Sequence, residues 1–331
     1  IFRKLLIGIL IFVLVCGIVL FFMTRKAAPS KIVYGMSFNT LYATELVLDW
    51  KETYDAILDD LHVKHLRLAA HWPMVEPLSH VYNFKELDYQ IKRAGEVHAD
   101  VILAVGKRLP RWPECHVPDW AKDLPKDQQQ QEILDYMTTV INRYKNDPTI
   151  TTWQIENEPY LEVFAKEHCG VLDEAFFEKE IALVRSLDAT RPLLVTDSGN
   201  LGSWFGAYKH GDIFGTSVYI YFWNPELGQF KTILPPWEYI VREHLMQLLY
   251  GKKETILVEL SAEPWLLAPI VDTDLQTQYS RMNLQKFNDI LEYAKQTKYS
   301  RQYLWGAEWW YWLKKQGNSE MWDRGKELFS Q

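Results

Sequence analysis

The chain has 331 residues, of which 48% are hydrophobic and 24% are charged, so it is too apolar to be disordered. Its three cysteines cannot build a disulfide scaffold, and its formal charge of -7 does not suit a phosphate backbone, which argues against nucleic-acid binding. Aromatic residues make up 14% of the chain, a content that fits a cleft stacking flat apolar faces.

The N-terminal segment differs from the rest of the chain. Residues 5–23 carry no charge and are flanked on each side by basic residues. A helix of this length spans about 28 Å, close to the hydrocarbon thickness of a bilayer. The segment predicts a transmembrane helix, and we expect residues 1–30 to be an uncleaved membrane anchor. A cleaved signal peptide is the alternative, although cutting after Ala27 would place a basic residue where a small one is needed.

The pattern of residues 31–331 predicts one domain. Short, wholly apolar runs alternate there with amphipathic helical patterns. Runs that are apolar throughout are typical of parallel strands buried on both faces. Eight such strands are predicted, at residues 32–37, 65–69, 100–105, 150–155, 192–196, 213–218, 255–259 and 301–306.

Eight strand–helix units in about 300 residues predict an α/β fold, a single (β/α)8 TIM barrel preceded by one N-terminal transmembrane helix. A doubly wound open sheet is the alternative. It is disfavoured because residues 35–39, which follow the first strand, contain no glycine-rich phosphate loop.

In a barrel of this kind the catalytic face lies where the strands end. The fourth strand ends in Glu156, Asn157 and Glu158, and the seventh ends at Glu259. Carboxylates on these two strands should face one another across the barrel mouth. Cleavage of a glycosidic bond requires such a pair, because one carboxyl group protonates the leaving oxygen while the other attacks or stabilises the anomeric carbon.

Four further residues near strand ends suit supporting roles. Arg67 can keep the opposing carboxylate ionised, and Tyr219 can orient it through a hydrogen bond. Trp305 can form a platform for a sugar ring, and Asn157 can reach a sugar hydroxyl.

The residues Trp-Gln-Ile-Glu-Asn-Glu-Pro at 153–159 and Ile-Leu-Val-Glu at 256–259 resemble the clan A retaining glycoside hydrolases, the cellulase, mannanase and β-galactosidase-like (β/α)8 enzymes. The resemblance spans residues 31–331. It implies that Glu158 is the acid/base and Glu259 the nucleophile. Arg67, Asn157, Tyr219 and Trp305 also match the supporting residues of the clan.

Several assignments have competitors. Glu263 follows Glu259 closely and is the alternative nucleophile, and Glu156 competes with Glu158. His71 and Glu308 are candidate sugar-binding residues, each of which could instead pack or form an ion pair. One or two further tryptophans are expected to contact sugar, from the set Trp72, Trp112, Trp223, Trp265, Trp309 and Trp310.

Cys115 and Cys169 fall in the loops after the third and fourth strands, which are neighbours at the barrel mouth, so we expect that they can form a disulfide outside the cytoplasm. The sequence has no His/Cys cluster with metal-ligand spacing and no phosphate-binding loop. It predicts no metal, no nucleotide and no other cofactor.

The sequence therefore predicts a membrane-anchored retaining β-glycosidase that hydrolyses a β-linked poly- or oligosaccharide. We expect a single-pass protein with its catalytic domain outside the cytoplasm, or a secreted one if the N-terminal segment is cleaved. A transglycosylase on the same site and a non-catalytic carbohydrate-binding barrel are the alternatives.

Overall fold

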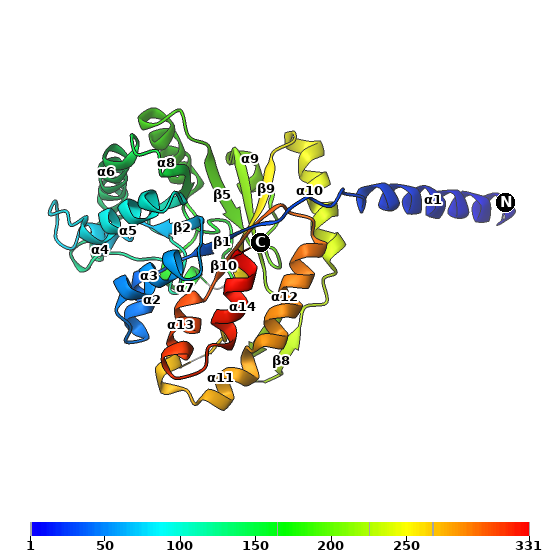
Figure 1. The fold of residues 1–331 in the computed structure, drawn as a ribbon. Coiled ribbons are helices and arrows are strands. Elements are labelled where there is room, and N and C mark those ends of the chain that lie inside the picture. Colours follow the sequence, from blue (N-terminus) through cyan, green and yellow to red (C-terminus); the bar gives the residue numbers. More distant parts are fainter. Residues whose placement is uncertain (1, 164, 225, 267, 331) are drawn as a thin grey trace.

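The computed structural model describes residues 2–163, 165–224, 226–266 and 268–330. Eight parallel strands close into a barrel in the order β1-β10-β9-β6-β5-β4-β3-β2, with helices around the outside (Figure 1). The predicted (β/α)8 barrel is confirmed. Its strands are β1 (Val33–Ser37), β2 (His65–Ala69), β3 (Asp100–Val105), β4 (Ile150–Ile155), β5 (Leu193–Asp197), β6 (Ile213–Val218), β9 (Glu254–Ser261) and β10 (Arg301–Trp305).

The apolar runs locate the strands closely. β2, β3, β4 and β6 have the predicted bounds, and most residues of each are buried. β9 extends two residues beyond its predicted end, so Glu259 lies inside the strand and not at its last position.

Several helices begin at an acidic or amide side chain that accepts a backbone N–H of the first turn. Asp49 does so for α3, Asp173 for α8 and Asn283 for α12. The helices are α1 (Phe2–Met23), α2 (Thr40–Glu45), α3 (Trp50–Asp59), α4 (Trp72–Val75), α5 (Lys85–Glu96), α6 (Lys126–Tyr144), α7 (Lys166–Cys169), α8 (Glu174–Leu187), α9 (Phe205–His210), α10 (Pro236–Tyr250), α11 (Leu275–Arg281), α12 (Leu284–Gln296), α13 (Ala307–Lys315) and α14 (Glu320–Phe329), with short 3-10 turns at Asp119–Ala121 and Ile270–Asp272.

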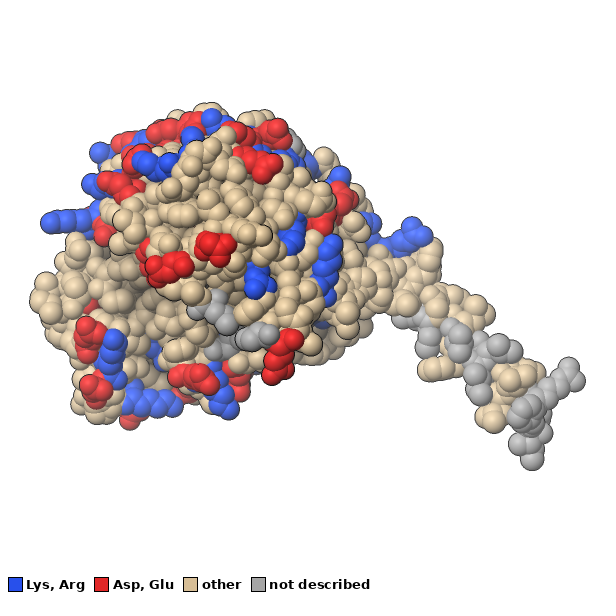
Figure 2. Space-filling view, turned by 90° about the horizontal axis from the view of Figure 1, so that it is seen from below, with Lys and Arg blue, Asp and Glu red and all other residues tan. Residues whose placement is uncertain are grey.

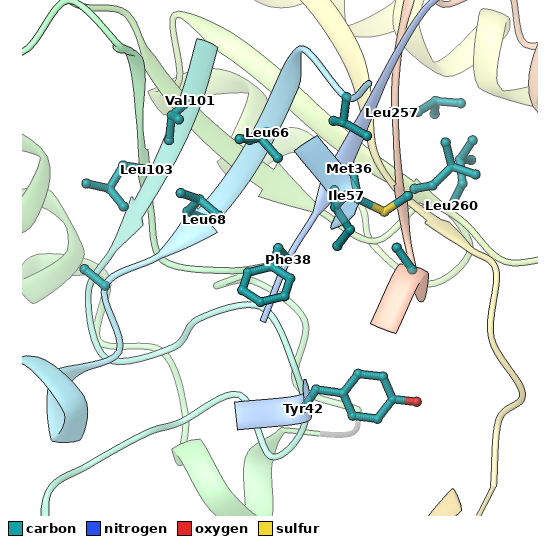
Figure 3. Close-up of a cluster of buried hydrophobic side chains, with 14 of the residues drawn as sticks. Met36, Phe38, Tyr42, Ile57, Leu66, Leu68, Val101, Leu103, Leu257 and Leu260 are labelled. Atoms are coloured by element: carbon teal, nitrogen blue, oxygen red, sulfur yellow. The ribbon is translucent and has the colours of Figure 1, made fainter. Parts of the chain in front are cut away.

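The core has two layers. Alternate residues of each strand point outward against the helices, as Figure 3 shows for Leu66 and Leu68 of β2 beside Val101 and Leu103 of β3. The residues between them face the barrel interior. A separate apolar cluster fills that interior below the mouth, composed of Ile102, Leu194, Ile213, Ile256, Val258 and Tyr303.

A β-bulge in β9 changes which side chains face inward. Against β6 the register passes from Thr216 opposite Leu257 to Ser217 opposite Glu259, so that Val258 is the additional residue. Val258 belongs to the interior cluster, and strict alternation would then turn Glu259 outward. The bulge allows two consecutive side chains to face the interior.

A two-stranded antiparallel hairpin follows β6, formed by β7 (Tyr221–Asn224) and β8 (Gly228–Lys231). The sequence analysis did not predict it. Its strands have only four residues each, and no long apolar run distinguishes them from a loop.

The N-terminal segment forms α1, which extends away from the barrel in both views, Figure 1 and Figure 2. Where the chain leaves this helix, the Lys26 side chain forms an ion pair with Glu243 of α10 at 2.5 Å.

The prediction of a transmembrane helix at residues 5–23 is wrong. Across the described ranges, no helix combines the length and the apolar content that a membrane crossing requires. Length, flanking basic residues and absence of charge are therefore not sufficient to predict a membrane span. The predicted membrane anchor and single-pass localisation are corrected by the same finding.

Candidate active site

Arg67 occupies the interior of the barrel at the level where the polar groups begin. It lies in β2 opposite Ile102 of β3, which is also an interior residue, and its side chain is buried. Its Nε donates to Gln154 Oε1 at 2.7 Å, its Nη2 to Asn157 Oδ1 at 2.7 Å and its Nη1 to Glu259 Oε1 at 2.9 Å. One guanidinium therefore ties together residues of β4, the following loop and β9.

Glu259 receives two strong donors at the floor of the mouth. Besides Arg67, the Tyr219 hydroxyl donates to Glu259 Oε2 at 2.9 Å. Burial, followed by the charge of Glu259, raises the pKa of Tyr219 well above its usual value, so this hydroxyl keeps its proton. A cation and a hydroxyl donor together suit an ionised carboxylate and fix its orientation.

Glu158 lies just beyond β4 in an unusual backbone conformation. Its φ is 44° and that of Glu156 is 55°, both in the left-handed region that non-glycine residues seldom adopt. The Glu158 N–H donates to Thr196 Oγ1 at 2.8 Å, and its Oε1 accepts from Ser217 Oγ at 2.9 Å. Ser217 of β6 pairs in register with Glu259 of β9, so the hydrogen bond from Ser217 holds the Glu158 carboxyl beside the strand that carries Glu259.

The two carboxyl groups have contrasting electrostatic environments. Burial raises the pKa of Glu158 well above its usual value, and the charges of Glu259 and Glu114 raise it further. Glu259, in contrast, has a salt bridge to Arg67. The two carboxyl groups therefore differ in their surroundings: negative neighbours face Glu158, whereas a cation contacts Glu259.

Glu156, the competitor of Glu158, has a different environment. Its carboxylate accepts the N–H groups of Lys107 and Arg108 at 2.7 and 2.5 Å. Burial raises the pKa of Glu156 and of its neighbour Glu180, so the pair can retain a proton between them. A Cβ on Gly106 would lie 2.4 Å from Glu156 Oε1, so glycine is needed for this close approach. Glu156 thus stabilises the loop after β3.

The sequence analysis missed Glu114. It lies in the loop after β3, where Arg108 Nε donates to its Oε2 at 2.6 Å. Burial raises the pKa of Glu114, and the charge of Glu259 raises it further, which indicates that the group faces the mouth. Ser217 and Gln154 were missed as well. No local motif marks these residues, because their contacts depend on the register of neighbouring strands.

Glu263, the alternative nucleophile, belongs to a second cluster. Its Oε1 accepts from Arg111 Nη1 at 2.8 Å, whereas Glu259 is bound by Arg67. Glu308 lies at the start of α13 and accepts the Asn39 N–H at 2.7 Å. Burial raises the pKa of Glu308 to about 7. These contacts separate Glu263 from the Arg67 network.

His71 is buried beside Asn39 and His116, with the His71 and His116 ring centroids 4.6 Å apart. Burial lowers the pKa of His71 to about 3, so the imidazole is neutral near pH 7. A neutral ring can accept or donate a hydrogen bond, but it supplies no charge to the site.

Trp305 ends β10, and its ring centroid lies 6.1 Å from that of Tyr219. Its Nε1 is buried without a hydrogen-bond partner. Among the other tryptophan candidates, exposure distinguishes two groups. Trp72, Trp309 and Trp310 are fully buried and donate to protein oxygens, whereas Trp112 is 58% exposed, Trp265 is 38% exposed and Trp223 is partly buried.

Cys115 and Cys169 form a disulfide that joins the loops after β3 and β4, with their Cα atoms 5.3 Å apart. The adjacent residue Glu114 faces the mouth, so the bond restrains the part of the loop that carries it.

We expect reduction of this disulfide to lower the free energy of unfolding by about 4 kcal/mol, because 54 residues separate the cysteines and the unfolded chain regains that loop entropy. Urea denaturation with and without reductant measures the difference. The Cys115→Ser/Cys169→Ser double variant is the control and should not respond to reductant. Equal midpoints for the oxidised and reduced forms would contradict the expectation.

Within the described part of the chain, one group of three side chains could hold a metal ion. Ligand atoms of Glu76, His80 and Glu132 lie within 4.8 Å of one another. Both oxygens of Glu76 already accept hydrogen bonds, from Trp72 Nε1 and from the His80 N–H. The group belongs to the segment after β2 and to α6, and we assign it no part in the chemistry at the mouth.

The sequence matches the family model described as beta-galactosidase, glycoside hydrolase family 42, over residues 124–309. This region is more than half of the chain and contains both Glu158 and Glu259. A comparison with curated proteins finds no match.

Solved glycosidase structures share the fold. GH5_18 from Bifidobacterium longum is 14% identical with a TM-score of 0.57, over 83% of this chain and 70% of that one. A family 5 mannosidase from Rhizomucor miehei is 17% identical with a TM-score of 0.57, over 85% and 82%. A beta-galactosidase from Halorubrum lacusprofundi is 12% identical with a TM-score of 0.53, over 83% and 52%.

At these identities the structural likeness establishes the barrel alone, while the family match covers the strands that carry both glutamates. The chain therefore belongs to the beta-galactosidase family of glycoside hydrolases, family 42, and is a clan A (β/α)8 glycoside hydrolase.

Proposed function

We propose that the enzyme hydrolyses β-linked O-glycosides by double displacement, with Glu259 as nucleophile and Glu158 as acid/base. The observation that carries this proposal is the contrast between two buried glutamates at the same end of the barrel, Glu158 after β4 and Glu259 in β9. Arg67 and Tyr219 donate to Glu259, while burial and negative neighbours raise the pKa of Glu158. The description of the family supports β-galactosides as the first substrates to test.

In the first step the Glu259 carboxylate forms an ester bond to the anomeric carbon. The glycosidic C–O bond breaks, and Glu158 transfers its proton to the departing oxygen. In the second step the Glu158 carboxylate removes a proton from water, whose oxygen displaces Glu259. Two inversions at one carbon give net retention, and each carboxyl group returns to its starting protonation state.

The surrounding residues support particular parts of this cycle. Arg67 binds the Asn157 oxygen, which leaves the amide NH2 group as the donor available to a sugar hydroxyl. The Trp305 indole can stack on the sugar ring, and its unpartnered Nε1 can donate a hydrogen bond. We assign sugar-binding roles to His71 and Glu308 as well. The catalytic unit is residues 31–331, which contain the entire barrel.

A covalent trap tests the proposal. Incubation with a panel of 2-deoxy-2-fluoro-β-glycosides carrying good leaving groups should label Glu259 with one sugar, because the fluorine slows hydrolysis of the ester more than its formation. Peptide mapping locates the label, and the identity of the reactive sugar defines the glycone. Labelling of Glu263, or product with inverted anomeric configuration, would refute the assignment.

The pH dependence follows from the protonation state of Glu158. Because its pKa is raised and its protonated form donates to the leaving group, kcat/KM should fall as pH rises through that pKa. Rate profiles with alkyl glycosides, whose leaving groups require protonation, measure this alkaline limb. The limb should disappear in the Glu158→Gln variant with an aryl substrate that departs without a proton. An unchanged limb in that variant would assign it to another group.

A further inference from the structure

A small pocket lies under the β7–β8 hairpin, beside the catalytic mouth. Its walls include Trp223, Gln229, Ser261, Trp265 and Arg281. Ser261 is two residues beyond Glu259 in β9, and the Trp265 ring centroid lies 5.7 Å from that of Tyr219. Figure 2 shows the side of the molecule on which β8 and α11 lie in Figure 1. We call this cavity the Arg281 pocket.

Arg281 is the last residue of α11, and its environment lacks the usual counter-charge. Its Cζ lies 4.1 Å from the centroid of the Trp223 ring, and its Nε is buried without a hydrogen-bond partner. Among the residues that the structure places, no carboxylate lies within 4.0 Å of its guanidinium. A guanidinium that stacks on an aromatic face and has no carboxylate partner retains its capacity for bidentate hydrogen bonds to an anion.

The charges around the pocket leave an excess of positive charge. Lys286 of α12 donates to Gln229 Oε1 and to the Ser280 carbonyl, both of which are neutral. Asp289 is already bound by Lys231 at 3.1 Å.

Among the wall residues the acidic one is Glu263, whose Oε1 is paired with Arg111 at 2.8 Å. Burial raises the pKa of Glu263, which lessens its negative charge further. The positive charge of Arg281 in the pocket, and that of Lys286 behind Gln229, therefore have no equivalent negative charge among the wall residues.

We propose that the Arg281 pocket binds the anionic group of an acidic saccharide, a carboxylate or a sulfate, while a linked sugar occupies the site of Glu158 and Glu259. The aromatic walls suit the apolar face of a sugar, and the guanidinium matches the two oxygens that a carboxylate or sulfate presents. This inference rests on the proposed function, and it defines the substrate class as acidic β-linked oligosaccharides.

Binding of small sugars to the full chain tests the pocket without turnover. D-galacturonic acid, D-galactose 6-sulfate and D-galactose are titrated by calorimetry and by tryptophan fluorescence. At least one acidic sugar should bind about tenfold more tightly than galactose, and the preference should weaken with salt because it is electrostatic. The acid that binds identifies the anionic group as carboxylate or sulfate. Equal affinity for all three sugars would overturn the proposal.

The Arg281→Gln variant should lose the preference for the acidic sugar, and thermal melting verifies that it folds. Arg185→Gln is the matched control, because Arg185 is a surface arginine of α8 already paired with Asp212 at 2.9 Å. A preference that survives in Arg281→Gln, or that disappears in Arg185→Gln, would also overturn the proposal. Fluorosugar labelling of Glu259 is a separate measurement, so failure of the pocket and failure of the catalytic assignment are distinguishable.

Discussion

Replacement of Glu259 by Gln is expected to lower kcat by about 10⁶-fold, the scale seen when a catalytic nucleophile is lost. The amide keeps the size of the side chain, and its one oxygen can still accept the hydrogen bond from Arg67 while its NH2 group faces the Tyr219 oxygen, but it cannot form the ester that the first step requires. Initial rates with aryl β-galactosides, compared at equal amounts of folded protein, measure the loss.

Glu263→Gln is the matched control for this experiment. Glu263 lies four residues further along the chain and is bound by Arg111 instead of Arg67, so its substitution should cost far less activity. Azide provides a second readout, because in Glu259→Gly it can occupy the space left by the carboxylate and attack the anomeric carbon. Recovery of a glycosyl azide with inverted configuration identifies the missing group as the nucleophile. A larger loss in Glu263→Gln than in Glu259→Gln would reverse the assignment.

The sequence predicts the barrel well because the barrel depends on local patterns. An unbroken apolar run such as 101–105 must be buried on both faces, and this requirement nearly defines a parallel strand between two layers of side chains. Strand ends are equally local, so Glu158 and Glu259 can be placed near the mouth before their contacts are known. The membrane helix was predicted from its length, its flanking basic residues and its absence of charge, and these criteria were not sufficient.

The detailed site depends on features that are not local. The bulge that turns Glu259 inward arises from the register of β9 against β6, and the positive φ at Glu158 is maintained by Thr196 of β5 and Ser217 of β6. Glu114 enters the site through a loop restrained by a disulfide. None of these can be read from neighbouring residues in the chain, because each needs two or three strands to be in place at once.

Arg67 joins several strands through its contacts with Gln154, Asn157 and Glu259, so its loss should affect both stability and activity. Arg67→Met preserves much of the apolar side-chain volume but leaves Glu259 buried without its cation, and Asn157 without the donor that orients it. Removing one partner of a buried ion pair typically costs 3–5 kcal/mol, so we expect unfolding free energy to fall by about that amount. Urea denaturation measures the change.

Two comparisons isolate the cause of this loss. Arg185→Met removes an exposed ion pair with Asp212 and should lower the unfolding free energy by about 0–1 kcal/mol. This variant is the control for replacing an arginine by methionine. The double variant Arg67→Met/Glu259→Gln should regain part of the stability lost in Arg67→Met, because a neutral amide in place of the carboxylate no longer needs a buried cation. The contrary result is additivity, in which the double variant loses the sum of the unfolding free energies lost in Arg67→Met and in Glu259→Gln. The two side chains would then be energetically independent. In that case Arg67 would stabilise the barrel through Gln154 and Asn157, and the ionised state of Glu259 would need another source.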